Sequence, residues 1–300
     1  MIITSATLAK INKGFRSLYL EAFQGGAPRV ASYAMRATSQ SAEEVYGWLG
    51  SVPGMRELIG EVVIRNLIEH AYSIPNKEFE STIAVKRSAI ERDKLGVYTP
   101  LFQAMGTAAR QHPDELLANT ILGGFEKPCY TGKPFFAANH EPQKGKTKFS
   151  NVGTKKLSAV NFRTARENIK SRLNADGRPM NLGLDLVLVV SPKNEALGRE
   201  ILVAELVGGG NTNVDKGTAR LEVWPQLAGT PDAWFLFEVG YPVKPFIHQV
   251  EVETEFQSLD NPADSHVLLK KEYLHQSYGR YNTGYGLPEL VYGSDGSAAA

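Results

Sequence analysis

The chain has 300 residues, enough for one large domain or two ordinary ones with a substantial core. It is 42% hydrophobic, 22% charged and 9% aromatic, which argues against wholesale disorder, collagen-like repeats and a disulfide-built miniprotein. Its 33 basic and 32 acidic residues give a formal charge of +1, so it lacks the overall basic charge that drives tight nucleic-acid binding.

Cysteine content and hydropathy bear on the compartment. The single cysteine, Cys129, excludes an internal disulfide and fits a reducing compartment. The N-terminus lacks the basic and apolar segments of a signal peptide. The longest aliphatic run, Leu186 to Val190, is too short to cross a bilayer. We therefore expect a soluble intracellular protein.

The first segment has the pattern of an amphipathic helix. Apolar residues recur at spacings of three and four from Leu8 to Ala22, which places them on one face. Gly25, Gly26 and Pro28 follow and end the helix. Such a helix must bury its apolar face against its own body or against a neighbouring subunit.

A short helix and a long hairpin are expected next. Ser41 and Glu44 have the spacing of a capping box, which predicts a helix from Ser41. Between Val62 and Lys94 apolar and polar residues alternate, which predicts two strands with Pro75 and Asn76 as the turn between them. An isolated hairpin of this kind is marginal, so it lies on its own domain or projects onto another chain.

The longest helical pattern begins at Thr99 and extends to two glycines. Thr99 is the expected N-cap, and Pro100 occupies the first helical position, where its missing N–H costs nothing. Pro113 predicts a kink or a split. Gly123 and Gly124 end the helix.

The remainder predicts an α/β layer followed by β structure. After a turn-rich segment with possible short strands near Phe135 and Phe136, Ser158 caps a helix. A buried strand over 184–190 and a second helix to about residue 207 follow. Gly208 to Gly210 is expected to be a mobile loop. Later strands are predicted at 221–224, 234–237, 247–256 and 267–278, with a frayed tail at 294–300.

Signals for catalysis or cofactor binding are weak. Gly145 to Thr147 resembles the end of a phosphate-binding loop, but His140 stands where that loop needs glycine. Cys129 and His140 are a conceivable nucleophile and base of a cysteine hydrolase, without a strained nucleophile turn or an oxyanion hole. The six histidines lack the spacing of a zinc site. We predict no catalytic, cofactor-binding or metal-binding residue and no cofactor.

Charge is segregated along the chain. Seven basic residues and no acid lie between Pro142 and Arg166, whereas Leu221 to Leu269 holds eight acids and one base. The ordinary explanation is two solvated faces. A second is electrostatic complementarity between copies of the chain, which would steer assembly. A third is nucleic-acid binding by the 142–166 stretch, which has few aromatic residues for stacking on bases.

The order of the elements and four stretches of sequence resemble the major head subunits of Mu-like phages and prophages. The stretches are MIITSATLAKINKGFRSLYLEAFQG, EEVYGWLGSVPGMREL, LGVYTPLFQAMGTAARQHPDELL and GFEKPCYTGKPFF. The resemblance covers essentially the whole chain and implies the α+β fold of tailed-phage major capsid proteins, also seen in herpesvirus capsid floors. It implies a structural protein, not an enzyme, whose pentamers and hexamers build an icosahedral shell around double-stranded DNA.

The resemblance also implies a division of the chain and a set of partners. Implied partners are other copies, a portal, decoration proteins and non-specifically contacted DNA, without a membrane, in a virion assembled in the bacterial cytoplasm. Because the chain begins at the arm, we expect the scaffold to be a separate protein. Asn76 and Lys77 lie near the predicted hairpin tip, but we identify no reactive pair and predict no cross-link. The implied parts are an N-terminal arm over a neighbouring subunit (1–54), an extended hairpin loop (55–95), a peripheral domain (96–157 and 234–300) and an axial domain (158–233).

Overall fold

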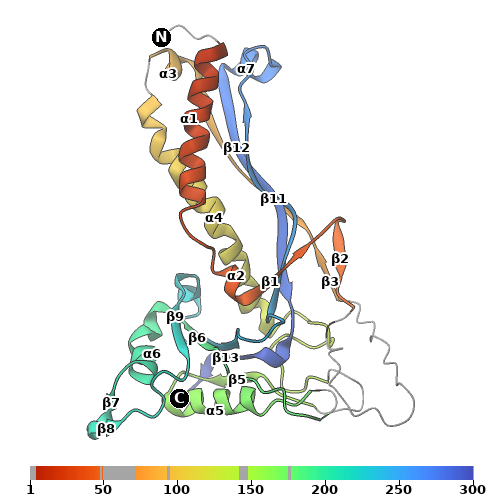
Figure 1. The fold of residues 1–300 in the computed structure, drawn as a ribbon, viewed down its shortest axis with the longest axis vertical. Helices are drawn as coiled ribbons and strands as arrows, with labels where there is room; N and C mark the ends of the chain where they lie inside the picture. Colours follow the sequence, from red (N-terminus) through yellow and green to blue (C-terminus); the bar gives the residue numbers. More distant parts are fainter. Residues whose placement is uncertain are drawn as a thin grey trace.

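The computed structural model shows an elongated molecule, in which a long arm of helices and strands rises from a broader base (Figure 1). The first helix begins at the far end of the arm, and the chain ends in the base. The described residues are 5–47, 49, 72–92, 95–141, 148–174 and 177–299. No helix in these ranges is both long and apolar enough to cross a membrane.

Helices lie in both the arm and the base. The α-helices are α1 (Ser5–Phe23), α2 (Val30–Tyr33), α3 (Arg87–Glu91), α4 (Thr99–Leu122), α5 (Ala159–Lys170), α6 (Glu195–Leu202) and α7 (Ser265–Lys270). Short 3-10 turns include η1 (Leu95–Val97) and η4 (Gly208–Gly210).

The strands form two main sheets and two short ribbons. The arm sheet has the order β1-β11-β12-β4, and the base sheet has the order β5-β13-β10-β6-β9. The ribbons pair β2 with β3 and β7 with β8. The strands are β1 (Ala34–Thr38), β2 (Glu43–Val45), β3 (Ser73–Pro75), β4 (Lys77–Lys86), β5 (Val152–Lys155), β6 (Leu186–Val190), β7 (Leu206–Val207), β8 (Asn211–Thr212), β9 (Arg220–Val223), β10 (Trp234–Glu238), β11 (Phe246–Leu259), β12 (Glu272–Tyr285) and β13 (Val291–Ala298).

Helices α1 and α4 pack against each other along the arm (Figure 1). The predicted apolar face of α1 is confirmed, because Leu8 and Phe15 are buried and Ile11 and Leu18 pack against the same cluster. Tyr19, outside the predicted face, is buried as well. The ring of Phe15 stacks on that of Phe102 in α4, with centroids 4.2 Å apart. The apolar face of α1 is thus covered by its own chain, and the expectation that residues 1–54 run over a neighbouring subunit stays a prediction.

The predicted spine helix is confirmed as α4, which continues through Pro113 without a break. Pro100 lies in its first turn, as expected, and Tyr98 precedes it as the N-cap residue. The helix tolerates Pro113 because the loss of one backbone hydrogen bond is offset by packing against α1 and the arm sheet.

The predicted turn at Pro75 and Asn76 is wrong. Strands β3 and β4 follow each other along β12, since Lys77 pairs with Tyr281 while Asn282 Nδ2 donates to the Pro75 carbonyl at 2.7 Å. The long strand β4 is confirmed, with β12 as its partner. The first predicted strand of the hairpin lies mostly outside the described residues.

The helix predicted from Ser41 is also wrong. The Glu44 carboxylate does fold back, accepting from Gln40 N at 2.9 Å and from Ser41 Oγ at 3.0 Å. These bonds organise a turn instead of a helix start, because the next residues form β2 and pair with β3. A carboxylate in this spacing accepts from the nearby backbone and hydroxyl donors whether the segment that follows is a helix or a strand.

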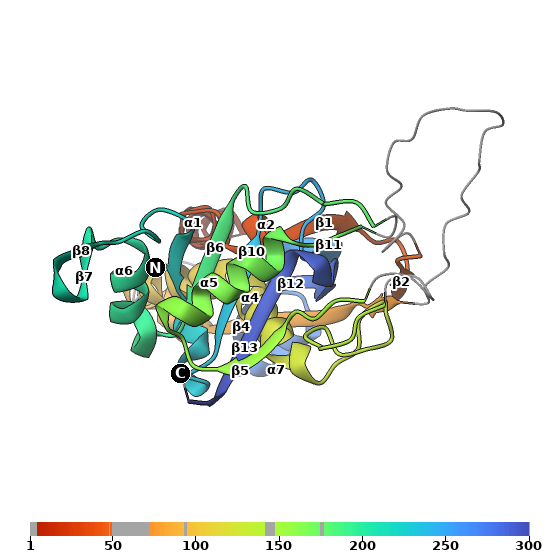
Figure 2. The ribbon, with the colours of Figure 1, turned by 90° about the horizontal axis from the view of Figure 1, so that it is seen from below.

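The base places helices beside a sheet of mostly buried strands, and α5 is seen on its outer side from below (Figure 2). Every residue of β6 and β10 is buried, as the apolar pattern of both segments predicts. Ser158 caps α5 through a hydrogen bond that its Oγ accepts from Asn161 N. Strands β5, β10 and β13 lie in the same sheet as β6 and β9, so residues on both sides of 158–233 build the base.

Three predictions near the ends of elements are wrong. The second helix of the base ends at Leu202, and β7 begins at Leu206. Residues 265–270 form α7 before β12 begins, where one strand was expected. The tail is not frayed through Ala298, because β13 pairs with β10 and β5. Phe135 and Phe136 are buried in turns and not in named strands.

Candidate assembly surfaces

Large apolar side chains are exposed at the far end of the arm. Val97 is 70% exposed, and Leu268 and Leu269 of α7 are 58% and 78% exposed. The inner sides of the neighbouring helices are packed, since Ile90 of α3 and Val267 of α7 are buried in one cluster. Their position together at one end of the molecule makes the far end of the arm a candidate interaction site.

The base has a second exposed apolar region around the β7–β8 ribbon. Val203, Leu206 and Val214 are 52%, 62% and 70% exposed, and the ribbon is at the outermost edge of the base (Figures 1 and 2). Asn213 fixes the neighbouring loop, because its Nδ2 donates to the carbonyls of Glu200, Ile201 and Ala204. The apolar side chains are therefore presented from an ordered frame.

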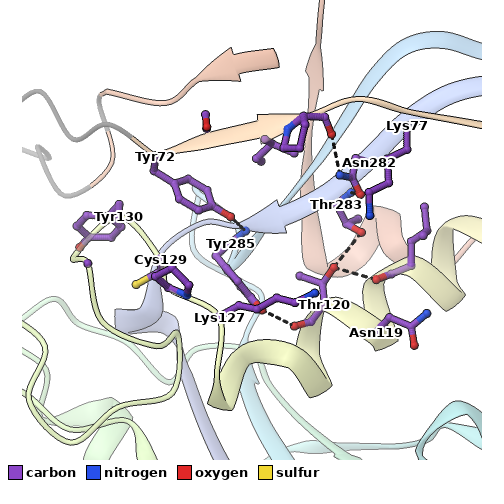
Figure 3. A pocket seen from close by; sticks show the side chains of 16 residues that line it. Tyr72, Lys77, Asn119, Thr120, Lys127, Cys129, Tyr130, Asn282, Thr283 and Tyr285 are labelled. Carbon is purple, nitrogen blue, oxygen red and sulfur yellow. Dashed lines mark hydrogen bonds between the residues drawn. The ribbon is translucent and has the colours of Figure 1, made fainter. Parts of the chain in front are cut away.

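A pocket of about 760 Å³ lies where the arm joins the base (Figure 3). Tyr285 N donates to the Tyr72 hydroxyl at 2.7 Å, and the Tyr285 hydroxyl donates to the Thr120 carbonyl at 2.9 Å. Lys77 and Lys127 also line the pocket, and none of the described residues that line it is acidic. Burial raises the pKa of both tyrosines, so their hydroxyls stay neutral and act as hydrogen-bonding groups.

The conceivable cysteine–histidine pair is separated by a threonine. Thr131 Oγ1 lies 3.3 Å from Cys129 Sγ and 2.9 Å from His140 Nδ1. Burial raises the pKa of the thiol to about 11 and lowers the pKa of His140 to about 4. Activation of a cysteine needs the opposite shift of the thiol, so this chain of hydrogen bonds does not form a nucleophile.

The basic stretch is partly neutralised within the chain. Arg163 Nε lies 2.7 Å from Asp215 Oδ2, and Arg166 NH1 lies 3.6 Å from Asp215 Oδ1. Lys156 lies 3.1 Å from Asp232, an acid of the 221–269 stretch. Some of the segregated charge is thus paired within one chain, so fewer unpaired charges remain to steer the approach of a second copy. Residues 142–147, with the phosphate-loop-like sequence, lie outside the described residues.

The histidines have structural surroundings. Burial lowers the pKa of His140, His248 and His275 to about 4, so these rings are neutral at pH 7. His112 Nδ1 lies 2.8 Å from the Tyr281 hydroxyl. Within the described ranges, no three His, Cys, Asp or Glu side chains are grouped to hold a metal. That the chain has no catalytic or metal-binding residue stays a prediction.

Sequence reasoning missed the polar residues at the root of the β2–β3 ribbon. Gln249 is fully buried in β11, where it contacts Tyr46, Ile74 and Asn76 through hydrogen bonds. The only sequence signal is a glutamine next to Val250 in a strand whose start is apolar. An alternating pattern alone assigns such a residue to the exposed face of the strand, so it does not predict that Gln249 is buried.

Comparison with known proteins gives matches along nearly the whole chain. The family model described as Mu-like prophage major head subunit gpT matches residues 8–156, 151–227 and 225–299. The major capsid protein of Escherichia phage Mu is 36% identical over 140 residues, which are 47% of this chain and 46% of the phage Mu protein. The Mu-like prophage FluMu major head subunit of Haemophilus influenzae is 24% identical over 288 residues, 96% of this chain and 72% of that protein.

A solved structure carries the same fold. The procapsid of bacteriophage JBD30 contains a chain that is 28% identical, with a TM-score of 0.61 over 97% of this chain and 76% of that chain. The tailed-phage major capsid fold, with its mixed helices and sheets, is therefore confirmed. The family consists of structural proteins and not of enzymes. The chain belongs to the family of Mu-like prophage major head subunits.

Proposed function

We propose that the chain is the repeating subunit of a phage head shell. Copies join into pentamers and hexamers, which close into an icosahedral shell around double-stranded DNA. The observation that carries the proposal is exposed apolar surface at both ends of an elongated chain of the major head subunit family. Copies of the chain cover this surface in the shell.

The placement of the exposed apolar groups supports this function. They include side chains at the far end of the arm, around the β7–β8 ribbon and on β2, so that one copy can contact several neighbours at once. Many modest contacts per subunit then add up to a stable shell.

The division of labour and the further partners are part of the proposal. Residues 158–233, together with the strands β5, β10 and β13 of the same sheet, form the axial domain that meets its copies around the symmetry axes, and the exposed apolar residues of the β7–β8 region lie in this range. Residues 55–95, of which 55–71, 93 and 94 lie outside the described residues, form the extended loop, and the remainder of 96–157 and 234–300 forms the peripheral domain. A scaffold, a portal, decoration proteins and packaged DNA are the expected partners in a virion assembled in the host cytoplasm.

Electron microscopy and sedimentation of the purified protein test the proposal. We expect closed particles of uniform diameter, and a protein that stays monomeric at high concentration contradicts the proposal. The double variant Leu268→Asp/Leu269→Asp places charge on the exposed end of the arm and should reduce assembly while the fold survives. Gln103→Asp on the exposed side of α4 is the matched control and should assemble as the wild type does.

A further inference from the structure

A buried amide lies inside the arm sheet beside the root of the β2–β3 ribbon. The side chain of Gln249 is 0% exposed in β11. Its Oε1 accepts from the Tyr46 hydroxyl at 2.8 Å. Its Nε2 donates to the Ile74 carbonyl at 2.9 Å and to Asn76 Oδ1 at 2.7 Å. Burial of an amide is costly without such partners, and here both ends of the amide are satisfied.

Asn76 extends the network to the other side of the ribbon. Its Nδ2 donates to Ser39 Oγ at 2.7 Å and to the Ser41 carbonyl at 2.8 Å, and its backbone N donates to the Ala42 carbonyl at 2.8 Å. We call Gln249, Asn76, Tyr46 and Ser39 the amide hub. The amide hub connects β11 to the chain before β2, to the chain after β2, to the middle of β3 and to the residue that follows β3.

Outside the amide hub, the ribbon is held at its root by the hydrogen bond from Asn282 Nδ2 to the Pro75 carbonyl and by apolar contact at Ile74. It consists of three residue pairs, from Glu43 with Pro75 to Val45 with Ser73, and it projects from the side of the arm (Figures 1 and 2). An isolated two-stranded ribbon is marginal at best. Val45 is 66% exposed, whereas Ile74 is buried against the arm. Apolar contact at Ile74 is non-directional, so it anchors the root without fixing an angle.

We propose that Gln249 is a positioning residue, which sets the angle at which the β2–β3 ribbon leaves the arm and thereby the geometry in which copies join. The second half of this inference depends on the proposed function. A leucine at 249 would serve burial alone, but a fully satisfied polar network selects one arrangement of the segments that it joins. Ring closure needs such a fixed angle, because a small error at the root of a projecting element displaces every contact beyond it.

Hydrogen exchange and assembly of Gln249→Leu test the proposal together. The amides of Tyr46 and Asn76, which donate to the carbonyls of Tyr72 and Ala42, should exchange at least tenfold faster. The amides of Val250 and Tyr281 in the β11–β12 pair should stay within about twofold of the wild type. The yield of uniform closed particles should fall at least fivefold.

Two further variants keep the test decisive. Tyr46→Phe removes one hydroxyl bond but keeps the ring, so its effects should be in the same direction and smaller; it replaces Gln249→Leu if that variant fails to fold. Gln257→Leu is the matched control, because Gln257 is an exposed residue of the same strand whose amide donates to Glu255. It should behave as the wild type.

The outcomes separate the two proposals. Unchanged exchange at Tyr46 and Asn76 overturns the role of the amide hub, as does a loosened ribbon with unchanged particle yield and diameter. An equal effect of Gln257→Leu also overturns it. A wild-type chain that never assembles overturns the proposed function, while the exchange rates still decide whether the amide hub fixes the ribbon.

Discussion

The contact between α1 and α4 predicts opposite effects on the free energy of unfolding when two helical glycines, Gly14 and Gly106, are replaced by alanine. Gly14 lies on the exposed side of α1, and nothing lies within 4 Å of the place where its Cβ would be. Gly14→Ala should therefore gain the helix propensity of alanine, about 0.8–1 kcal/mol in the free energy of unfolding. At Gly106 of α4, a Cβ would lie 2.3 Å from the Tyr19 carbonyl oxygen of α1.

The same substitution at Gly106 should destabilise the fold. The overlap is about 1 Å against an ordinary contact of 3.4 Å, and the clashing atom belongs to the backbone, so no rotamer change relieves it. The upper end of the overpacking cost, about 3 kcal/mol, exceeds the propensity gain of about 1 kcal/mol and leaves a loss of about 2 kcal/mol. Urea unfolding of the dissociated subunit, followed by far-ultraviolet circular dichroism, measures both variants. Stabilisation by Gly106→Ala equal to that of Gly14→Ala would refute the docking of α1 on its own α4.

Three further predictions concern buried and paired groups. Cys129→Ala should leave assembly intact. In the wild-type chain at pH 8, the Cys129 thiol, with a pKa of about 11, should react with disulfide reagents about 100-fold or more slower than it does in urea. Rapid labelling of the folded chain contradicts the burial of Cys129. The pKa of His140 and of His275 is about 4 in the folded chain and about 6.5 in the unfolded chain, so the stability that these neutral rings contribute is complete above pH 6.5 and is lost as the pH falls toward 4, by up to about 3 kcal/mol per ring. The raised pKa of Glu289 acts in the opposite direction. Urea midpoints that do not fall from pH 7 to pH 4.5 contradict this prediction. Asp215→Asn should lower the free energy of unfolding in urea by about 2 kcal/mol, because Asp215 is 1% exposed beside Arg163. Asp185→Asn, in an exposed pair with Arg220, should lower it by less than about 1 kcal/mol. Equal losses for the two variants refute this difference.

Elements whose stability depends on local pattern could be predicted from the sequence. The 3.6-residue periodicity of α1, the proline and glycine punctuation of α4 and the unbroken apolar runs of β6 and β10 each depend on neighbours in the sequence. Such patterns are sufficient because one face, or both faces, of the element is buried along its whole length. The resemblance to capsid proteins added the fold, which local pattern alone does not give.

Elements that depend on distant partners could not be predicted. β13 is rich in glycine and serine, which indicates a loop, yet β10 and β5 pair with it from both sides. The sequence predicts one strand over 267–278, but the chain must reverse between β11 and β12, and α7 makes that connection. At β13 tertiary pairing overrides local propensity, whereas at α7 the path of the chain between two distant strands decides the element.

The amide hub shows the same limit for a candidate site. Gln249 and Asn76 are 173 positions apart, and neither residue type indicates burial on its own. Their importance follows only from the register that brings β11 beside the root of the ribbon. A sequence pattern predicts which face is apolar, but it does not show which polar residue on that face is satisfied.

The packing of α1 changes which surfaces remain for other copies. From its sequence alone, the N-terminal helix is a natural candidate for contact with a neighbour, because its apolar face needs a cover. Phe15 and Tyr19 are covered by α4 and the arm sheet, so that face is already used. Uncovered apolar groups instead include those at the end of the arm, at the β7–β8 ribbon and at Val45, with Val160 and Leu184 also exposed in the base. A subunit that buries its helices internally and exposes apolar groups at separated points can fold first and assemble afterwards, and the relative placement of those points then determines the geometry of the shell.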